Sequence, residues 1–269
     1  MKRQRTRARP FRCLALGSAL AASGAALGLG LGTTGCVPQT GLGRATPLAP
    51  GRLRVGAAIL PSFETAMLQP EQPVTGPWAR LLVGAHVGVT EGFELGGRAW
   101  AFTLPTVGSE FGFAADAKLA LRTPGPSGGP SLSAALSLAY DQPRMPGAPW
   151  HLFHATLPLL IGWDFGENHF VLGPRVALQT ASAYGMETIV YPGFGLSVGF
   201  FGRVTESFDL APELAFVWAP IPFGGEGTDS SGRVGASSIQ LALGGAWELA
   251  ATSDAASPRT NAPAATASR

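Results

Sequence analysis

Apolar residues alternate with small or polar residues through most of the chain, from Gly51 to Leu249. Residues 110–122 show this best: Phe111 and Phe113 fall on one side of the pattern, and Asp116 and Lys118 on the other. A helix would scatter such residues around its circumference, whereas a strand separates them onto two faces. The pattern therefore predicts an all-β structure.

Ten runs of this kind can be distinguished. They cover residues 51–60, 78–90, 92–103, 107–122, 130–140, 150–165, 168–180, 188–203, 207–218 and 237–250. Many reach the roughly 9–11 residues that a tilted strand needs to cross a bilayer, while strands of soluble sandwiches are about 5–6 residues long. Proline removes a ladder hydrogen bond, so a proline inside a run predicts a bulge or a break. Such prolines are Pro158, Pro174, Pro192 and Pro212.

One face of each run is bulky and apolar, and the other is small or charged. In a soluble barrel the bulky face points inward, whereas in a membrane barrel it meets lipid and the lumen is polar. The long runs and the scarcity of charges favour the second arrangement. We therefore predict a closed antiparallel up-and-down transmembrane β-barrel of about 10 strands, within a range of 8–12. A water-soluble calyx is the alternative, and it would place Phe111, Leu136, Leu196 and Leu241 inside.

The connections between the runs differ in length. Tight turns are expected at residues 90–92, 166–168 and 205–207, which contain turn-forming residues. With ten strands, these turns lie at the same end as both termini. Long loops are expected over 61–77 and 219–236 at the other end, in keeping with the short periplasmic turns and longer outer loops of outer-membrane barrels. The stretch 123–129 is a longer connection on the short-turn side.

Two short segments are nearly identical: VTEGFEL at residues 89–95 and VTESFDL at 204–210. Each leaves one run, turns and enters the next. This resembles the strand–turn–strand signature of the small bacterial outer-membrane β-barrel protein family. The resemblance implies an outer-membrane location, contact with outer-membrane lipids and handling by the barrel-assembly machinery. It implies no ligand.

The N-terminus has the three parts of a secretory signal peptide. Six basic residues precede an apolar stretch over 13–32, and small residues follow. Residues 33–36, TTGC, resemble the lipobox of bacterial lipoproteins, which implies a diacylglyceryl group on Cys36; that family prefers Leu where Thr33 stands, and ordinary cleavage beside an unmodified Cys is the alternative. The predicted organisation is a signal peptide over 1–36, a linker over 37–50, a barrel over 51–250 and a disordered C-terminal tail over 251–269.

The charge balance changes when the signal peptide is removed. Six of the 19 Lys and Arg, and none of the 17 Asp and Glu, lie in residues 1–36. The remaining chain thus has 13 basic and 17 acidic residues, a net charge of −4. The basic character of the whole chain is therefore no argument for nucleic-acid binding, and no nucleic-acid partner is expected.

Charged residues of both signs are expected to line the lumen. They are Arg54, Arg80, Glu94, Arg98, Glu110, Asp116, Lys118, Arg175, Asp209, Glu213 and Glu248. Buried charges must pair, so the first interpretation is a salt-bridge network that fills the lumen. The second is the lining of a narrow, selective pore. Barrels of eight strands are essentially filled and those of sixteen leave a channel, so ten strands lie nearer the filled end.

The sequence contains no clear catalytic or metal-binding motif. His151 and His154 are three residues apart on a predicted strand and therefore point to opposite faces. His154 and Thr156 share a face, which leaves a lipid hydrolase as a distant alternative, but no third partner can be placed. We expect no enzyme, metal or cofactor. The leading hypothesis is a structural or binding barrel that contacts extracellular partners through 61–77 and 219–236; the second is a narrow pore or carrier for small or apolar solutes.

Overall fold

A computed structural model describes residues 43–69, 72–104, 108–124, 128–144, 150–183, 188–223 and 232–250. The predicted signal peptide, Cys36 and the C-terminal tail lie outside these residues. Within the described part, no helix has the length and apolar character needed to cross a membrane.

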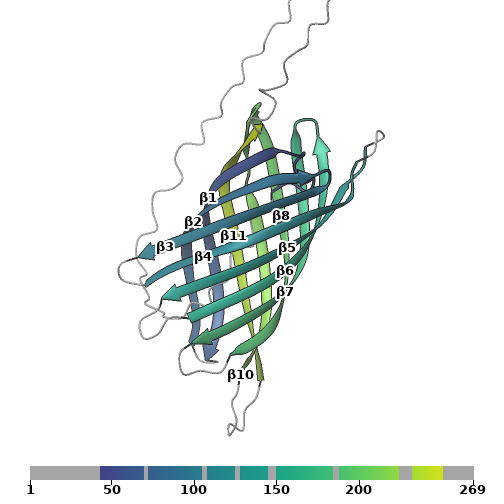
Figure 1. The fold of residues 1–269 in the computed structure, drawn as a ribbon. Coiled ribbons are helices and arrows are strands. Elements are labelled where there is room, and N and C mark those ends of the chain that lie inside the picture. The colour runs from purple at the N-terminus through teal and green to yellow at the C-terminus, as the bar shows by residue number, and fades with distance from the viewer. Residues whose placement is uncertain are drawn as a thin grey trace, which may run out of the picture.

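Eleven β-strands make up a single sheet that closes on itself (Figure 1). Their bounds are β1 Arg52–Gln69, β2 Gln72–Thr90, β3 Phe93–Leu104, β4 Gly108–Arg122, β5 Ser131–Arg144, β6 Trp150–Phe165, β7 Asn168–Ala183, β8 Ile189–Thr205, β9 Phe208–Leu210, β10 Glu213–Phe223 and β11 Gly232–Ala250. Each described pairing is antiparallel, and β1 closes the barrel by pairing with β11. The strands are tilted against the barrel axis, and β1 begins at the same end at which β11 finishes.

Strands β9 and β10 are two halves of one wall strand. Both lie between β8 and β11, and the pairing register with each neighbour continues from one half to the other without a shift. The interruption falls at Ala211 and Pro212, although the amide of Phe200 still donates to the Pro212 carbonyl. The wall therefore has ten strands, which confirms the predicted fold class.

The prolines within strands interrupt ladders without ending the strands, except at Pro212. Strand β6 runs through Pro158 and β7 through Pro174. Two pairings are missing at and beside each proline, between β5 and β6 at Pro158 and between β6 and β7 at Pro174. Pro192 lies in β8 beyond the last residue that pairs with β10. A missing N–H removes one hydrogen bond of the ladder, and the remaining neighbours keep the strand extended.

The prediction of long loops over 61–77 and 219–236 is wrong. Residues 61–69 continue β1, 72–77 begin β2, 219–223 continue β10 and 232–236 begin β11. The segment before residue 78 contains Pro73 and Pro77, which lie in the part of β2 that pairs with β1 and has no described pairing to β3. A strand edge without a partner tolerates a residue that lacks an N–H.

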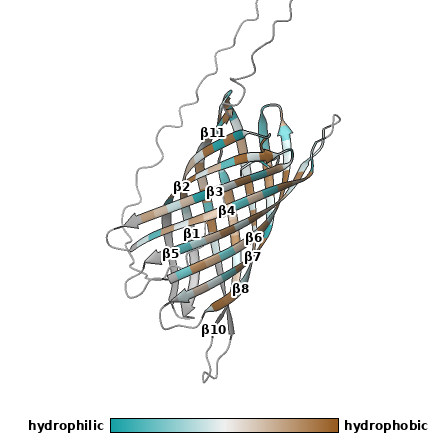
Figure 2. Cartoon of the chain, in the orientation of Figure 1, coloured by the Kyte–Doolittle hydropathy of each residue, from teal (hydrophilic) through white to brown (hydrophobic). Residues whose placement is uncertain are grey.

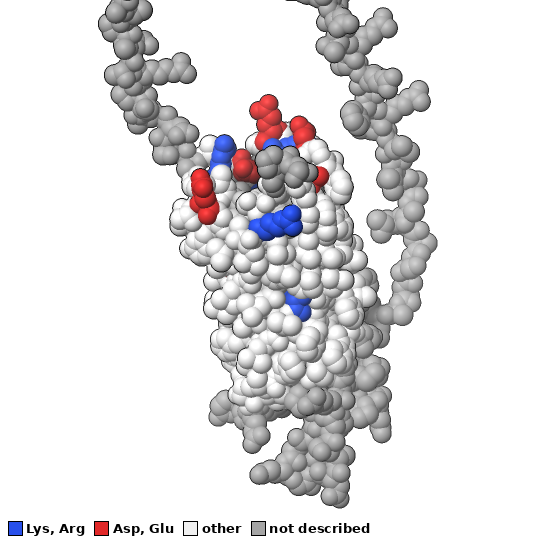
Figure 3. Space-filling view, turned by 90° about the vertical axis from the view of Figure 1, so that its right-hand side faces the viewer, with Lys and Arg blue, Asp and Glu red and all other residues white. Residues whose placement is uncertain are grey.

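The bulky apolar face points outward. Phe111, Leu136 and Leu196 are 49%, 39% and 42% exposed, contrary to the expectation for a calyx. Figure 2 shows hydrophobic and hydrophilic residues alternating along the strands. The exposed charged side chains of the described residues all lie at or next to turns at the end of the barrel where β1 begins and β11 finishes. They are Arg52, Glu91, Arg122, Asp164, Glu167 and Glu206. Figure 3 shows charges gathered at that rim and a largely uncharged wall below it.

Candidate functional site

Charged side chains line the inward face of the wall, whereas the outward face is apolar. Alternate residues of each strand point inward, which brings charges from neighbouring strands side by side. Asp116 on β4 binds Arg98 on β3 through both oxygens, at 2.7 Å from Nε and 2.9 Å from the second guanidinium nitrogen. Arg98 also donates to Ser137 on β5 at 2.8 Å, and His86 on β2 lies 3.5 Å from Asp116. Charge-assisted bidentate pairs of this kind fix geometry as well as contributing energy.

Further pairs occupy other levels of the lumen. Lys118 donates to Glu94 at 2.8 Å. Arg80, which is 1% exposed, binds both carboxylate oxygens of Glu110 at 2.6 and 3.0 Å and donates to Ser62 at 2.7 Å. Arg175 donates to the hydroxyl of Ser197 and is attracted by Glu213. These contacts cross between strands, so they bind the wall together from inside.

The eleven lumenal residues expected from the sequence occupy two environments. Ten are buried: Arg54, Arg80, Glu94, Arg98, Glu110, Asp116, Lys118, Arg175, Asp209 and Glu213. Glu248 is 25% exposed and lies near the rim, 3.5 Å from Arg54. Sequence reasoning did not identify Asp141, His169 or Arg44 as lumenal; Asp141 is fully buried and accepts a hydrogen bond from Trp100 at 3.3 Å.

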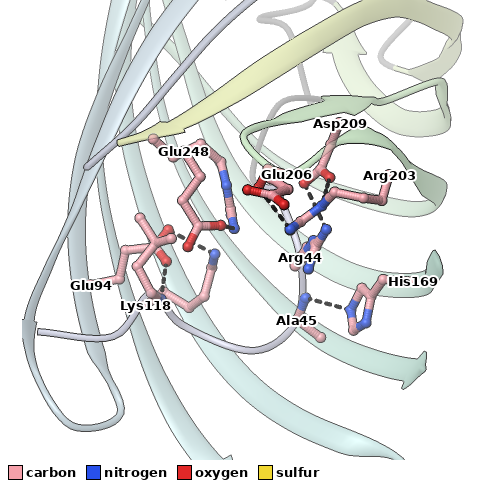
Figure 4. A network of polar contacts seen from close by, with 11 residues as sticks. Arg44, Ala45, Glu94, Lys118, His169, Arg203, Glu206, Asp209 and Glu248 are labelled. Carbon is pink, nitrogen blue, oxygen red and sulfur yellow. Dashed lines mark hydrogen bonds and ion pairs between the residues drawn. The ribbon is translucent and has the colours of Figure 1, made fainter. Parts of the chain in front are cut away.

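Residues 43–50 form an N-terminal segment, here called the plug, and its residues 43–48 lie inside the barrel (Figure 4). Ala45 is 0% and Leu48 is 4% exposed. The Leu48 amide donates to Glu94 at 2.8 Å, and Ala45 donates to His169 Nε2 at 3.1 Å. The Ala45 carbonyl accepts a hydrogen bond of 2.6 Å from Ser133. Residues 43–50 were predicted as a linker; they are instead held in the lumen from several sides.

Ion pairs and close packing reinforce the plug. Arg44 lies 2.6 Å from Asp209, which also binds Arg203 at 2.8 Å. Behind the plug, Ala45 packs with Ala135, Leu160, Val171 and Phe201. A Cβ added to Gly88 would lie only 2.1 Å from the Ala49 carbonyl oxygen, so glycine is required where the plug leaves the lumen.

Small spaces remain beside the plug. A cavity of about 70 Å³ lies between Gly43, Arg54, His86, Arg98 and small residues of β1 and β11. A neighbouring space of about 10 Å³ borders Leu160 and Arg175. One water needs about 10–15 Å³ measured in this way, so these spaces fit a few waters. Both spaces are lined by Gly43, Phe201 and Glu213, so they adjoin each other beside the plug.

The lumen toward the other end has a different character. Leu152, Ala181, Tyr191 and Ala219, with Ile189 beside them, form an inward-facing group that we call the apolar cluster. His154 lies two residues along β6 from Leu152 and is 3% exposed, and neither of its ring nitrogens has a hydrogen-bond partner in the described structure. Among the described residues no group of three or more His, Cys, Asp or Glu is placed to hold a metal ion.

Comparisons with known proteins show similarity of shape alone. No family model and no curated protein matches this chain. The outer membrane protease OmpT from Escherichia coli is 8% identical, with a TM-score of 0.44, and the match covers 75% of this chain and 97% of that one. Neisserial surface protein A is 13% identical, with a TM-score of 0.38 and coverage of 73% and 98%. OprG from Pseudomonas aeruginosa is 10% identical, with a TM-score of 0.35 and coverage of 76% and 99%.

Proposed function

We propose that this protein spans the bacterial outer membrane as a sealed barrel with a structural or binding role. The observation that carries the proposal is the distribution of charge: described side chains that are both charged and exposed lie at one rim, while the wall below presents large apolar side chains. A wall of this kind exposes far more apolar surface than soluble proteins tolerate. In a membrane it needs no further explanation, because a closed barrel satisfies its backbone hydrogen bonds internally.

The orientation follows from the turns. The end with the tight turns at Glu91–Gly92, Gly166–Glu167 and Glu206–Ser207 is the periplasmic end in our proposal, together with both barrel termini. A signal peptide would export the chain, and the barrel-assembly machinery would insert it. A diacylglyceryl group on Cys36 would add a second attachment seven residues before the plug, at roughly 0.8 kcal/mol per buried methylene.

A filled lumen argues against a water-filled channel. Charged pairs on neighbouring strands project into the interior, and the plug is hydrogen-bonded beside them. Within the predicted partner segments, residues 61–69, 72–77, 219–223 and 232–236 extend the wall toward the outer side, where contact with extracellular partners is proposed. A role by contact therefore fits the structure better than a role by conduction.

The surroundings of His154 and Thr156 do not favour a lipid hydrolase. Both side chains are buried in the lumen, and no hydroxyl of the described residues bonds to either His154 nitrogen. A general base needs its nucleophile within hydrogen-bond reach. We propose a role without catalysis.

Cell-envelope fractionation tests the location. The mature chain should sediment with the outer membrane and resist extraction by high salt and carbonate, since lipid contact with the wall does not depend on charge. Replacing Cys36 with Ser should leave the barrel in the membrane fraction. Recovery of the Cys36→Ser chain in the soluble periplasm would overturn the proposal.

Planar-bilayer conductance tests the seal. The full mature chain should give no stable channel, whereas deletion of residues 43–50 should produce small, steady conductance steps, because the plug hydrogen bonds and the Ala45 packing are lost. Deletion of eight residues from the C-terminal tail, 251–258, is the matched control and should remain silent. Steady conductance of the intact chain would instead support the narrow-pore alternative.

A further inference from the structure

The ladder between β8 and β10 stops short of the outer end of the barrel. It joins Phe194–Gly199 to Glu213–Trp218, and no described pairing lies beyond Phe194 and Trp218. Residues 189–193 of β8 still pair with β7, and residues 219–223 of β10 still pair with β11. Each of these two segments thus has a backbone partner on one side only, and no described backbone pairing joins one segment to the other. We call these two segments the proline seam.

Prolines explain why the ladder stops. The Phe200 amide donates to the Pro212 carbonyl. In an antiparallel ladder such hydrogen-bonded pairs recur at every second residue. The N–H and C=O groups of the even-numbered residues of β8 and β10 therefore face the neighbouring strand. Continuing the register from Phe194 opposite Trp218 sets Pro192 opposite Pro220 and Val190 opposite Pro222. Closing the seam would need four N–H donors from these residues, and three of them have none. Only Val190 could donate.

The two sides of the seam are both apolar. On the outer side, Phe194 and Trp218 stack with their centroids 6.2 Å apart at the last paired position, and Val190 is 54% exposed. On the inner side lies the apolar cluster, to which β8 contributes Ile189 and Tyr191 and β10 contributes Ala219. Side-chain packing across the seam thus replaces backbone hydrogen bonds. Such packing separates more easily than a ladder, because it is not directional.

We propose that the barrel wall opens at the proline seam and that a single unbranched hydrocarbon chain passes there between the apolar cluster and the membrane. The cluster offers such a chain an apolar surface, and the ion pairs and plug beyond it block the axial route. Of the stacked rings of Phe194 and Trp218, only the indole N–H could bond to a polar solute, and neither ring offers an acceptor. The inference rests on the proposed membrane location and goes beyond the contact role proposed above.

Photolabelling tests the passage directly. The full mature chain is placed in phosphatidylcholine vesicles that contain a fatty acid with a diazirine near the end of its chain, and adducts are located by peptide sequencing. Leu152 and Phe153 are neighbours on β6: Leu152 is 3% exposed and faces the lumen, whereas Phe153 is 53% exposed and faces outward. We expect adducts on Phe153 and also on the lumenal residues Leu152 and Tyr191.

A triple variant, Pro192→Val with Pro220→Val and Pro222→Val, restores the three donors. Each new ladder hydrogen bond should shift an opening equilibrium about fivefold, so lumenal labelling should fall on the order of a hundredfold while Phe153 labelling stays unchanged. Pro174→Val, which restores a donor between β6 and β7, is the matched control and should keep wild-type labelling at all three residues. The Phe153 adduct also reports that each variant is folded and inserted.

Three results would count against the proposal. Labelled Phe153 with unlabelled Leu152 and Tyr191 would show that the seam stays shut. Lumenal labelling unaffected by the triple variant would show entry through the open mouth of the barrel. Absence of label from Phe153 as well would refute the membrane placement itself. A diazirine phospholipid, used separately, identifies the source of the chain: lumenal adducts from it assign the passage to membrane lipids, and adducts from the fatty acid alone assign it to single-chain solutes.

Discussion

The two faces of the barrel wall are built in different ways. The outward face carries large apolar side chains that need no particular partner, such as Leu157 at 56% and Leu243 at 53% exposure. The inward face depends on specific partners: Arg98 needs Asp116, and Lys118 needs Glu94. Lipid accepts any apolar shape, whereas a buried charge requires a matching group in a defined place. The outward face should therefore tolerate any substitution that stays apolar. The inward face should tolerate only substitutions that leave no buried charge without its partner.

The largest expected effect is the loss of one member of an inner ion pair. Asp116→Ala leaves the Arg98 guanidinium buried without its bidentate partner, and unfolding by urea in lipid vesicles should show a loss of about 3–5 kcal/mol. The double variant Arg98→Met with Asp116→Leu removes both charges and should cost much less. Equal losses in the single and double variants would show that partnership does not govern the inner face.

A charge placed on the outer face should come next in size. Leu196→Arg, in the middle of β8, should reduce the free energy of unfolding in vesicles by about 2–4 kcal/mol, because the guanidinium would lie near the bilayer midplane. Leu249→Arg, at the end of β11, is the matched control and should cost about 0–1 kcal/mol. Equal losses of stability in the two variants would show that the cost of a charge on the outward face does not depend on its depth in the membrane.

Two lumenal histidines should give smaller effects of opposite sign. His169 accepts a hydrogen bond from Ala45 and bonds to Asp164, so His169→Leu should destabilise the barrel by about 1–3 kcal/mol. His154 has no partner among the described residues, so His154→Leu should stabilise it by about 1 kcal/mol. Urea unfolding of the two variants measures both. Destabilisation by His154→Leu would reveal a partner for this ring and would weaken the contrast.

The outer face could be predicted far better than the inner one. Alternation around Phe111 and Leu136 predicts both the strands and the side on which each residue lies, since a strand has a period of two. The plug could not be predicted: residues 43–50 contain two prolines and no periodicity, and their burial depends on His169 and Ser133, far away in the sequence. Ion-pair partners were equally hidden, because they depend on register between strands. The proline seam is a mixed case, since Pro192 and Pro220 are visible in the sequence, but their opposition appears only once β8 and β10 are aligned.

The most direct test of the account asks what surrounds the outward side chains. Nitroxide labels are attached singly at Phe111→Cys, Leu136→Cys and Leu196→Cys in a mature Cys36→Ser chain in vesicles, and relaxation by oxygen and by a water-soluble nickel chelate is compared. Oxygen concentrates in lipid and the chelate stays in water. We predict strong relaxation by oxygen and weak relaxation by nickel at all three positions. Labels shielded from both reagents, as in a dry protein interior, would contradict an outward apolar face.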